Sequence, residues 1–406
     1  MTGKPQTGDA AGTRPGLPVV RLSELRLADF RNYETLRLTF DRGFVAFVGD
    51  NGAGKTNLIE AVSLLTPGRG LRRATYQDIA RKGGSGGFSI RAGLVSLQGG
   101  TNVVTKVQPD PAGPAARTVR IDETAAKSAD ELLGLLRILW LTPAMDGLFT
   151  GPTGDRRRFL DRMVLAVDPT HGRRAVNYER AMRSRNRLLS DNRMDDSWLS
   201  GIEAQMAELG VAMALARAEL VGMLAGMIEQ SGADNPFPKA GLDLASGYGD
   251  TDLSRPSADI EDEARTRLGA GRHADRAAGR TLIGAHRADL SVVHLAKAMP
   301  AALSSTGEQK ALLIGLVLAH ARLVAAVSSL PPILLLDEIA AHLDPGRRAA
   351  LFDLIAELGV QAFMTGTDAS LFDALGDRAQ MLEVTSGTVR PAPASGATSA
   401  ESEQGR

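Results

Sequence analysis

Gly49-Asp-Asn-Gly-Ala-Gly-Lys-Thr56 matches the phosphate-binding pattern G-x-x-x-x-G-K-[ST] at every position and decides the fold class of this chain. It follows an apolar run, Phe44-Val-Ala-Phe-Val48, which predicts a buried strand. Glycines allow a tight turn whose backbone N–H groups point at phosphate oxygens, so an ordinary strand-to-helix turn is the weaker interpretation. Lys55 supplies a positive charge to the β- and γ-phosphates, and the Thr56 hydroxyl is a ligand for Mg²⁺. We therefore expect a site for a nucleoside triphosphate and Mg²⁺, built from Gly49, Asp50, Asn51, Gly52, Ala53, Gly54, Lys55 and Thr56.

An acidic pair ends a second apolar run. Ile333-Leu-Leu-Leu-Asp337-Glu338 follows Pro331-Pro332 and predicts a buried strand with two acids at its end. Asp337 is suited to the Mg²⁺ coordination shell, and Glu338 is suited to polarising the attacking water. Apolar strands that end in Asp-Glu are also common in structural roles. The pairing with the phosphate loop is what predicts catalysis by Lys55, Asp337 and Glu338.

A third segment, Ser304-Ser-Thr-Gly-Glu-Gln-Lys310, precedes an apolar stretch that predicts a helix. Ser305 or Thr306 can cap that helix, and Gly307 with the free N–H groups can form an anion site. One interpretation is a simple helix cap. The other is the signature loop of an ABC-type ATPase, in which Ser305 and Gly307 complete the nucleotide site of a second molecule. The order of the motifs favours the second, and Asp344 in Ala341-His-Leu-Asp344 is then a candidate D-loop residue.

Six segments together resemble a known family. They are Leu25-Arg-Leu-Ala-Asp-Phe-Arg-Asn-Tyr33, the phosphate loop, Arg156-Arg-Arg-Phe-Leu-Asp161, Thr281-Leu-Ile-Gly-Ala-His-Arg-Ala-Asp-Leu290, Ser305-Thr-Gly-Glu-Gln309 and Thr365-Gly-Thr-Asp368. Their order and spacing, from about residue 21 to residue 390, resemble the RecF family of bacterial DNA replication and repair ATPases.

The resemblance implies a function. It implies a cytoplasmic, ATP-dependent DNA-binding protein of recombinational repair, with weak ATPase activity that resets a DNA-bound dimer. The ATP-induced homodimer would bind double-stranded DNA near single-strand gaps. With RecO and RecR it would promote RecA loading, replication-fork maintenance and SOS induction.

Two places depart from the family pattern. Pro143-Ala-Met-Asp146 stands where relatives usually carry Pro-Glu-Asp-Leu, and no glutamine occupies the usual Q-loop place. The switch histidine of ABC transporters is also absent near Thr365-Gly-Thr367. Thr367 is our prediction for that position, because Asp368 matches the acid that commonly follows.

Composition agrees with a multidomain protein. The chain has 406 residues, 43% of them apolar, a net charge of zero and no cysteine, which fits a cytosolic protein without disulfides. The first twenty residues lack the apolar core of a signal peptide, and no stretch has the roughly 18 uninterrupted apolar residues of a membrane span. The net charge alone does not indicate a nucleic-acid partner.

The pattern of periodicities predicts an α/β fold in which one ATPase domain is interrupted in the sequence by a mainly helical arm domain. The resemblance implies that this domain is an ABC/SMC-type P-loop ATPase head. We expect tails without regular structure at residues 1–20 and 391–406, which are rich in small residues and proline. The head would comprise residues 21–150, with the phosphate loop, and 281–390, with the signature loop and the acidic pair. The arm would comprise residues 151–280.

The arm carries the marked charge cluster of the chain. From Asp155 to Arg193 there are eleven arginines and five acids, a local excess of about six positive charges. Four of the arginines fall on one helical face and predict contacts to the DNA backbone: Arg173, Arg180, Arg183 and Arg187. A solvated face with internal Arg–Asp pairs is the alternative.

Two other classes of protein contain a phosphate loop. The nucleotide-binding subunit of an ABC transporter would need a switch histidine and a surface for a membrane subunit. A small-molecule kinase would leave the Ser305 segment without a role.

Overall fold

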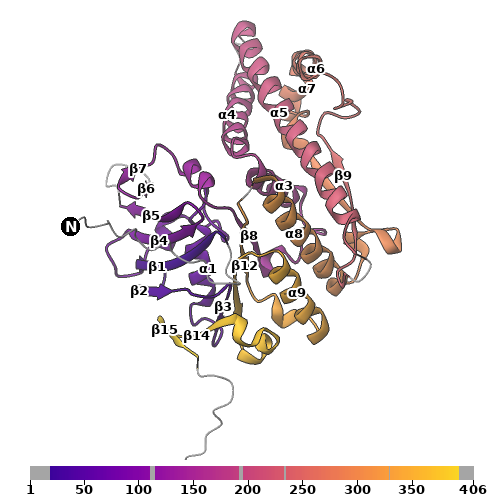
Figure 1. Cartoon of the computed structure of the whole chain (residues 1–406). Helices are drawn as coiled ribbons and strands as arrows, with labels where there is room; N and C mark the ends of the chain where they lie inside the picture. Colours follow the sequence, from indigo (N-terminus) through magenta and orange to yellow (C-terminus); the bar gives the residue numbers. More distant parts are fainter. Residues whose placement is uncertain (1–18, 110–114, 192–194, 233–234, 329, 393–406) are drawn as a thin grey trace, which may run out of the picture. The chain divides into compact units, whose positions relative to one another are not determined.

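The computed structural model describes residues 19–109, 115–191, 195–232, 235–328 and 330–392 (Figure 1). Most of both predicted tails therefore lies outside the described residues. The chain forms two compact units, one of residues 1–140 and 330–406 and the other of residues 141–329. We call the first the nucleotide unit and the second the arm unit.

A parallel core sheet holds the nucleotide unit together. Within the described residues its order is β15-β14-β3-β13-β12-β8, and β3, β12, β13 and β14 run parallel. Every residue of β3 and β12 is buried, as the apolar runs predicted, and every residue of β13 is buried as well. The carboxyl ends of parallel strands meet at one edge, which brings the phosphate loop after β3 beside Asp337 after β12. The strands are β3 (Phe44–Val48), β8 (Ile138–Leu141), β12 (Ile333–Leu336), β13 (Ala362–Gly366), β14 (Ala379–Thr385) and β15 (Thr388–Pro391).

The second sheet of the nucleotide unit is antiparallel, in the order β2-β1-β4-β5-β6-β7. Buried and exposed residues alternate along its strands, so that one face is packed and the other faces solvent. The strands are β1 (Arg21–Phe30), β2 (Tyr33–Thr39), β4 (Phe88–Ser96), β5 (Gly99–Gln108), β6 (Ala116–Ile121) and β7 (Thr124–Ala125).

Helices complete the unit: α1 (Lys55–Ser63), α2 (Tyr76–Ile79) and α9 (Pro345–Glu357), with 3-10 segments η1 (Ala129–Gly134), η6 (Ala340–His342) and η7 (Ala369–Arg378). The sequence also predicts a short strand at residues 120–123 and a helix at residues 132–136, and both predictions need correction. Arg120–Glu123 is not a strand throughout, because β6 ends at Ile121 and Asp122, with φ 52°, makes the turn to β7. The helix expected at Leu132–Leu136 is the 3-10 segment η1, which ends at Gly134.

The arm unit consists mainly of helices. They are α3 (Thr153–Val167), α4 (His171–Ser190), α5 (Asp196–Glu229), α6 (Ser257–Ala270), α7 (Arg272–Ala278) and α8 (Thr306–Ser328), with 3-10 segments η2 (Pro143–Met145), η3 (Ala285–Arg287), η4 (Leu295–Lys297) and η5 (Ala301–Leu303). A small antiparallel sheet in the order β11-β10-β9 joins β9 (Ala240–Ala245), β10 (Asp289–His294) and β11 (Met299–Pro300). The apolar core of the arm unit contains Tyr178, Met206, Val211, Tyr248 and Ile260.

A buried ionic cluster fixes α4 within the arm unit. The Arg185 guanidinium is fully buried and donates to Glu203 Oε1 (3.0 Å) and Asp275 Oδ2 (2.6 Å). Arg272 also pairs with Glu203, at 2.6 Å. Removal of one partner from such a cluster costs about 3–5 kcal/mol, because a buried charge is left uncompensated.

The helices α5 and α8 are long and apolar enough to cross a membrane by length and composition alone. Core helices of soluble proteins meet the same criterion, and 67% of the apolar window of α8 is buried within the protein. The compact units do not coincide with the predicted head and arm, since residues 281–329 pack within the arm unit. Compactness does not say which segments serve an ATPase head, so the predicted division stays a prediction.

Candidate nucleotide site

The phosphate loop adopts a backbone that only glycine accommodates readily. Gly49, Gly52 and Gly54 have φ angles of 144°, 83° and 115°, all in the region that side chains disfavour. A Cβ at Gly49 would lie 2.3 Å from Val384 O, so this position also lacks space for a side chain. Helix α1 begins at Lys55, directly after the loop. The N-terminus of α1 is therefore presented beside a backbone that can surround an anion.

Lys55 folds back over the loop that precedes it. Its Nζ donates to Gly49 O (2.6 Å) and Asp50 O (2.8 Å). Burial lowers the pKa of Lys55, while the charges of Glu338, Asp337 and Asp50 oppose that shift. The Lys55 ammonium group thus lies near both the loop and the acidic pair. A cation in this place can bind the terminal phosphates of a nucleotide.

Thr56 and Asp337 are 281 residues apart in the sequence and lie in direct contact. Thr56 Oγ1 donates to Asp337 Oδ1 at 3.0 Å. Asp337 is 6% exposed, and burial raises its pKa against the opposing hydrogen bonds from Thr365 and Thr56. A hydroxyl beside a buried carboxylate is a donor set of oxygens that Mg²⁺ prefers. The residues present therefore fit the predicted Mg²⁺ site.

Thr365 is a site residue that sequence reasoning did not single out. Its hydroxyl donates to Asp337 Oδ1 (2.7 Å) and accepts a hydrogen bond from the Glu338 N–H (2.9 Å). Glu338 has a φ of 55°, a left-handed conformation that costs energy for a residue with a side chain. Thr365, 1% exposed, holds this backbone from the neighbouring strand β13.

The turn between β1 and β2 supports the phosphate loop from outside. Tyr33 Oη donates to Gly54 O (3.1 Å), and Asn32 Nδ2 donates to Ala53 O (3.3 Å). In the same turn Arg31 forms a bidentate pair with the buried Glu60 of α1, at 2.6 Å and 2.8 Å. These residues lie in the Leu25–Tyr33 stretch that carried the family resemblance, and that was the only signal for them.

The predicted signature residues lie at the start of α8 in the arm unit. Ser305 and Glu308 form a reciprocal cap: the Ser305 N–H donates to Glu308 Oε2 (3.1 Å), and the Glu308 N–H donates to Ser305 Oγ (3.4 Å). Gly307 is in the first turn, with nothing within 4 Å of where a Cβ would stand. Asp146, at the place that lacks the Q-loop glutamine, accepts from Lys310 Nζ of α8 at 3.2 Å.

The remaining predicted nucleotide residues lie in the nucleotide unit. Asp344 caps α9 by accepting from the Arg347 N–H at 2.9 Å. Thr367 lies after β13 and is exposed. It lines a cavity of about 720 Å³ together with Gly49, Asn51 and Asp368. The structure thus places Thr367 beside the phosphate loop, whereas Thr365 contacts the acidic pair.

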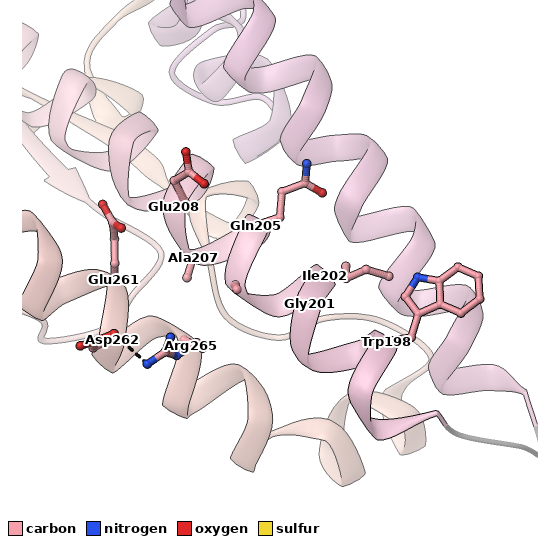
Figure 2. Close-up of a pocket in the computed structure, with 10 residues that line it drawn as sticks. Trp198, Gly201, Ile202, Gln205, Ala207, Glu208, Glu261, Asp262 and Arg265 are labelled. Atoms are coloured by element: carbon pink, nitrogen blue, oxygen red, sulfur yellow. Dashed lines mark ion pairs between the residues drawn. The ribbon is translucent and has the colours of Figure 1, made fainter.

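A second cavity, of about 660 Å³, lies between α5 and α6 of the arm unit (Figure 2). Glu208 from α5 and Glu261 from α6 line it, together with Asp262, which pairs with Arg265 at 2.9 Å. Burial and the charges of Glu208 and Asp262 raise the pKa of Glu261. This acidic lining does not suit phosphate. The cavity beside the phosphate loop is also lined by acids, Asp50, Asp368 and Glu383, so the loop backbone with Lys55 and Thr56, and not either cavity, defines the candidate nucleotide site.

The four predicted DNA-contacting arginines lie on α4 and are all exposed: Arg173, Arg180, Arg183 and Arg187. None of them pairs with a carboxylate among the described residues. Other arginines of the arm do, as Arg156 with Asp289 at 2.8 Å and the buried Arg185 show. The internal Arg–Asp pairs of the alternative interpretation therefore involve different arginines.

The parallel sheet, the phosphate loop and the acidic pair beside it define a P-loop ATPase head of the ABC/SMC type. The RecF/RecN/SMC N-terminal domain matches residues 21–389. The DNA replication and repair protein RecF of Rhizobium leguminosarum bv. trifolii is 61% identical over 91% of this chain and 98% of its own length. The RecF protein of Mesorhizobium japonicum is 58% identical over 91% of this chain and 97% of its own length. The chain therefore belongs to the RecF family of DNA replication and repair proteins.

Solved structures agree on the fold. The recombination mediator protein RecF-ATP in the RecFOR pathway has a TM-score of 0.82 at 21% identity, covering 94% of this chain and 100% of that one. The Smc head domain of Pyrococcus furiosus, solved with an extended coiled coil and the C-terminal domain of ScpA, has a TM-score of 0.51 at 16% identity, covering 92% and 96%. The predicted RecF resemblance and ABC/SMC-type fold are confirmed.

Proposed function

We propose that this protein binds ATP with Mg²⁺ at the phosphate loop and uses it to control binding to DNA. The observation that carries the proposal is the contact between Thr56 Oγ1 and Asp337 Oδ1. It joins the phosphate loop to the acidic pair, the two parts that phosphoryl transfer requires. The ATP-bound RecF structure of the same fold supports the choice of nucleotide.

The residues divide the work of slow ATP hydrolysis among them. The N–H groups of residues 49–56 bind the phosphates, and Lys55 neutralises their charge. Thr56 and Asp337 would hold Mg²⁺, which supplies further charge neutralisation when bound. Glu338 accepts a hydrogen bond from the attacking water and orients it. Thr365 fixes the backbone of Glu338 and the carboxylate of Asp337 in the required orientation.

The signature residues act in a second copy of the chain. Ser305 and Gly307, at the N-terminus of α8, are proposed to bind the γ-phosphate held by the partner's phosphate loop. Asp344 and Thr367 are proposed to complete the same interface. ATP then joins two copies, and its hydrolysis releases them.

The dimer is proposed to clamp double-stranded DNA near single-strand gaps, with Arg173, Arg180, Arg183 and Arg187 as backbone contacts. RecO and RecR are the proposed partners of this dimer. With them it would promote RecA loading, replication-fork maintenance and SOS induction in the cytoplasm. Membership of the RecF family and the relative named for the RecFOR pathway support this assignment. Family membership also disfavours the ABC-transporter subunit.

Sedimentation with and without ATP tests the proposal. We expect a monomer that becomes a dimer with ATP and Mg²⁺, and a complex with duplex that forms only when ATP is present. A gapped duplex should be bound more tightly than a blunt duplex of equal length. Duplex binding that is independent of ATP would contradict the proposal.

A further inference from the structure

A row of arginines crosses one face of the antiparallel sheet of the nucleotide unit. Arg26 on β1 lies opposite Arg37 on β2 and opposite Arg91 on β4. Arg91 lies opposite Val104 on β5, which in turn lies opposite Arg120 on β6. Residues paired across neighbouring strands point to the same face, so the four arginines share one face and one row.

Lys106 adds a fifth cation to this face, because it lies two residues beyond Val104 on the same strand. We call these five residues the basic sheet face: Arg26, Arg37, Arg91, Lys106 and Arg120. The opposite face of the sheet is apolar and buried, with Leu25, Leu27, Ile90, Val103 and Val119. The sheet therefore buries one side and offers the other to solvent.

The charge of the basic sheet face is largely uncompensated. Among the described residues that these strands direct to this face, Glu24 is the single acid. It accepts from Arg26 Nε at 3.0 Å and also pairs with Arg37, which keeps both guanidinium groups in place. Five cations against one carboxylate leave four positive charges, in a protein whose total net charge is zero. Arg91 and Lys106 are exposed and pair with no carboxylate among the described residues.

The dimensions and composition of the face suit a nucleic-acid backbone. Neighbouring strands are about 4.8 Å apart, so the row from Arg37 to Arg120 spans about 19 Å. Duplex DNA carries one negative charge per about 1.7 Å of its axis, which is enough to occupy every cation of the row. Small residues such as Ser89, Gly93 and Thr118 share the face and permit close approach.

The face directs no aromatic side chain to solvent among the described residues. Single strands are bound largely by stacking of bases on aromatic rings, which this surface does not offer. Duplex DNA needs only phosphate contacts from arginine and lysine. The chemistry of the face thus favours the backbone of a duplex over an unpaired strand.

We infer that the basic sheet face binds the phosphate backbone of double-stranded DNA without reading its bases. The inference rests on the proposed function, in which ATP-dependent binding to duplex occurs, and assigns a DNA contact to the nucleotide unit besides the arginines of α4. An acidic protein surface is the competing partner.

The first test removes charge from the face. In the variant Arg91→Gln, Lys106→Gln, Arg120→Gln, duplex affinity is measured by fluorescence anisotropy with ATP over a salt series. The slope of log affinity against log salt should flatten by about 0.9 per lost contact. A matched control, Arg42→Gln, Lys82→Gln, Lys127→Gln, removes three exposed charges from loops of the same unit and should keep the parent slope.

The outcomes separate the inference from the proposed function. A parent protein that fails to bind duplex with ATP would reject the proposed function and the inference with it. Normal parent binding, with an unchanged slope in the variant or an equal loss in the control, would reject the basic sheet face alone. A variant that binds duplex normally but loses affinity for poly-glutamate would replace DNA by an acidic protein as the partner.

The second test locates the contact directly. The chain contains no cysteine, so Thr118→Cys, labelled with a photo-crosslinker, reports from one position on the face. Asp41→Cys, in an exposed loop after β2, is the control. We expect crosslinks to duplex from position 118 well above those from position 41. Equal yields from the two positions would overturn the inference.

Discussion

The hydroxyl of Thr365 donates to Asp337 Oδ1 at 2.7 Å and therefore helps to fix the carboxylate oxygen to which Thr56 also donates. The same hydroxyl accepts the N–H of Glu338, whose backbone is in the left-handed region. One buried side chain thus positions both members of the acidic pair, although it contacts neither nucleotide phosphates nor water in the proposed mechanism.

We therefore expect Thr365→Val, which keeps the shape but removes the hydroxyl, to slow single-turnover hydrolysis by tenfold or more while changing ATP affinity little. An unpaired buried polar group costs about 1–3 kcal/mol, which is about one to two decades in rate. Thr365→Ser should restore the rate because it restores the hydroxyl. If serine and valine hydrolyse ATP equally slowly, the hydrogen bonds of Thr365 are not the cause.

Lys55→Met removes the charge that faces the phosphates. ATP affinity and all ATP-dependent steps should fall, by about tenfold to a thousandfold at 1.4 kcal/mol per decade. Titration with a fluorescent ATP analogue measures the loss, and Lys82→Met, an exposed lysine of the same unit, should bind like the parent. Unchanged affinity in Lys55→Met would contradict the site.

Glu338→Gln keeps the size of the side chain but cannot polarise water as a carboxylate does. The variant should bind ATP normally, hydrolyse it slowly and form a longer-lived dimer. Single-turnover hydrolysis and sedimentation measure these effects, with Glu123→Gln, an exposed acid in the turn before β7, as the control. Hydrolysis at the parent rate would move the catalytic role to another residue.

The triple variant Arg180→Ala, Arg183→Ala, Arg187→Ala tests whether the α4 arginines contact DNA. Loss of up to three phosphate contacts should flatten the salt dependence of duplex binding by about 0.9 per contact. The control variant Arg265→Ala, Arg276→Ala, Arg280→Ala removes three exposed arginines of the same unit. An unaltered slope with intact ATPase would show that the α4 arginines form only a solvated face.

Ser305→Arg separates a shared nucleotide site from a helix cap. We expect nearly normal ATP binding by the monomer, because the phosphate loop is untouched, and loss of ATP-induced dimerisation, because a bulky cation enters the proposed interface. Ser305→Ala removes the cap at a cost of about 1 kcal/mol but adds no bulk, and it should still dimerise. A Ser305→Arg variant that sediments with ATP like the parent would make Ser305 only a cap.

Short sequence patterns predicted the structural elements that depend on interactions within a few residues. The phosphate loop and the buried strands β3 and β12 could be predicted, because glycine conformations and apolar runs act over a few residues. The Asp337 contact to Thr56 could be expected because parallel strands end at one edge of their sheet.

The features that could not be predicted depend on contacts between segments that are distant in the sequence. The role of Thr365 depends on β13 lying beside β12, in a register that sets Leu336 opposite Met364. Arg183 and Arg185 look alike in the sequence, yet one is exposed and the other fully buried among carboxylates. The arginines of the basic sheet face come from four separate strands, so no window of sequence contains them together.

Gly54 links two parts of the nucleotide unit that are otherwise distant in function. A Cβ there would stand 2.6 Å from Asn32 Nδ2 and 2.7 Å from Tyr33 Oη, so the phosphate loop and the β1–β2 turn have no free space between them. A side chain at position 54 would therefore require Asn32 or Tyr33 to shift. Because that turn joins β1 and β2, which carry Arg26 and Arg37, the close fit at one glycine connects the phosphate loop to strands of the basic sheet face.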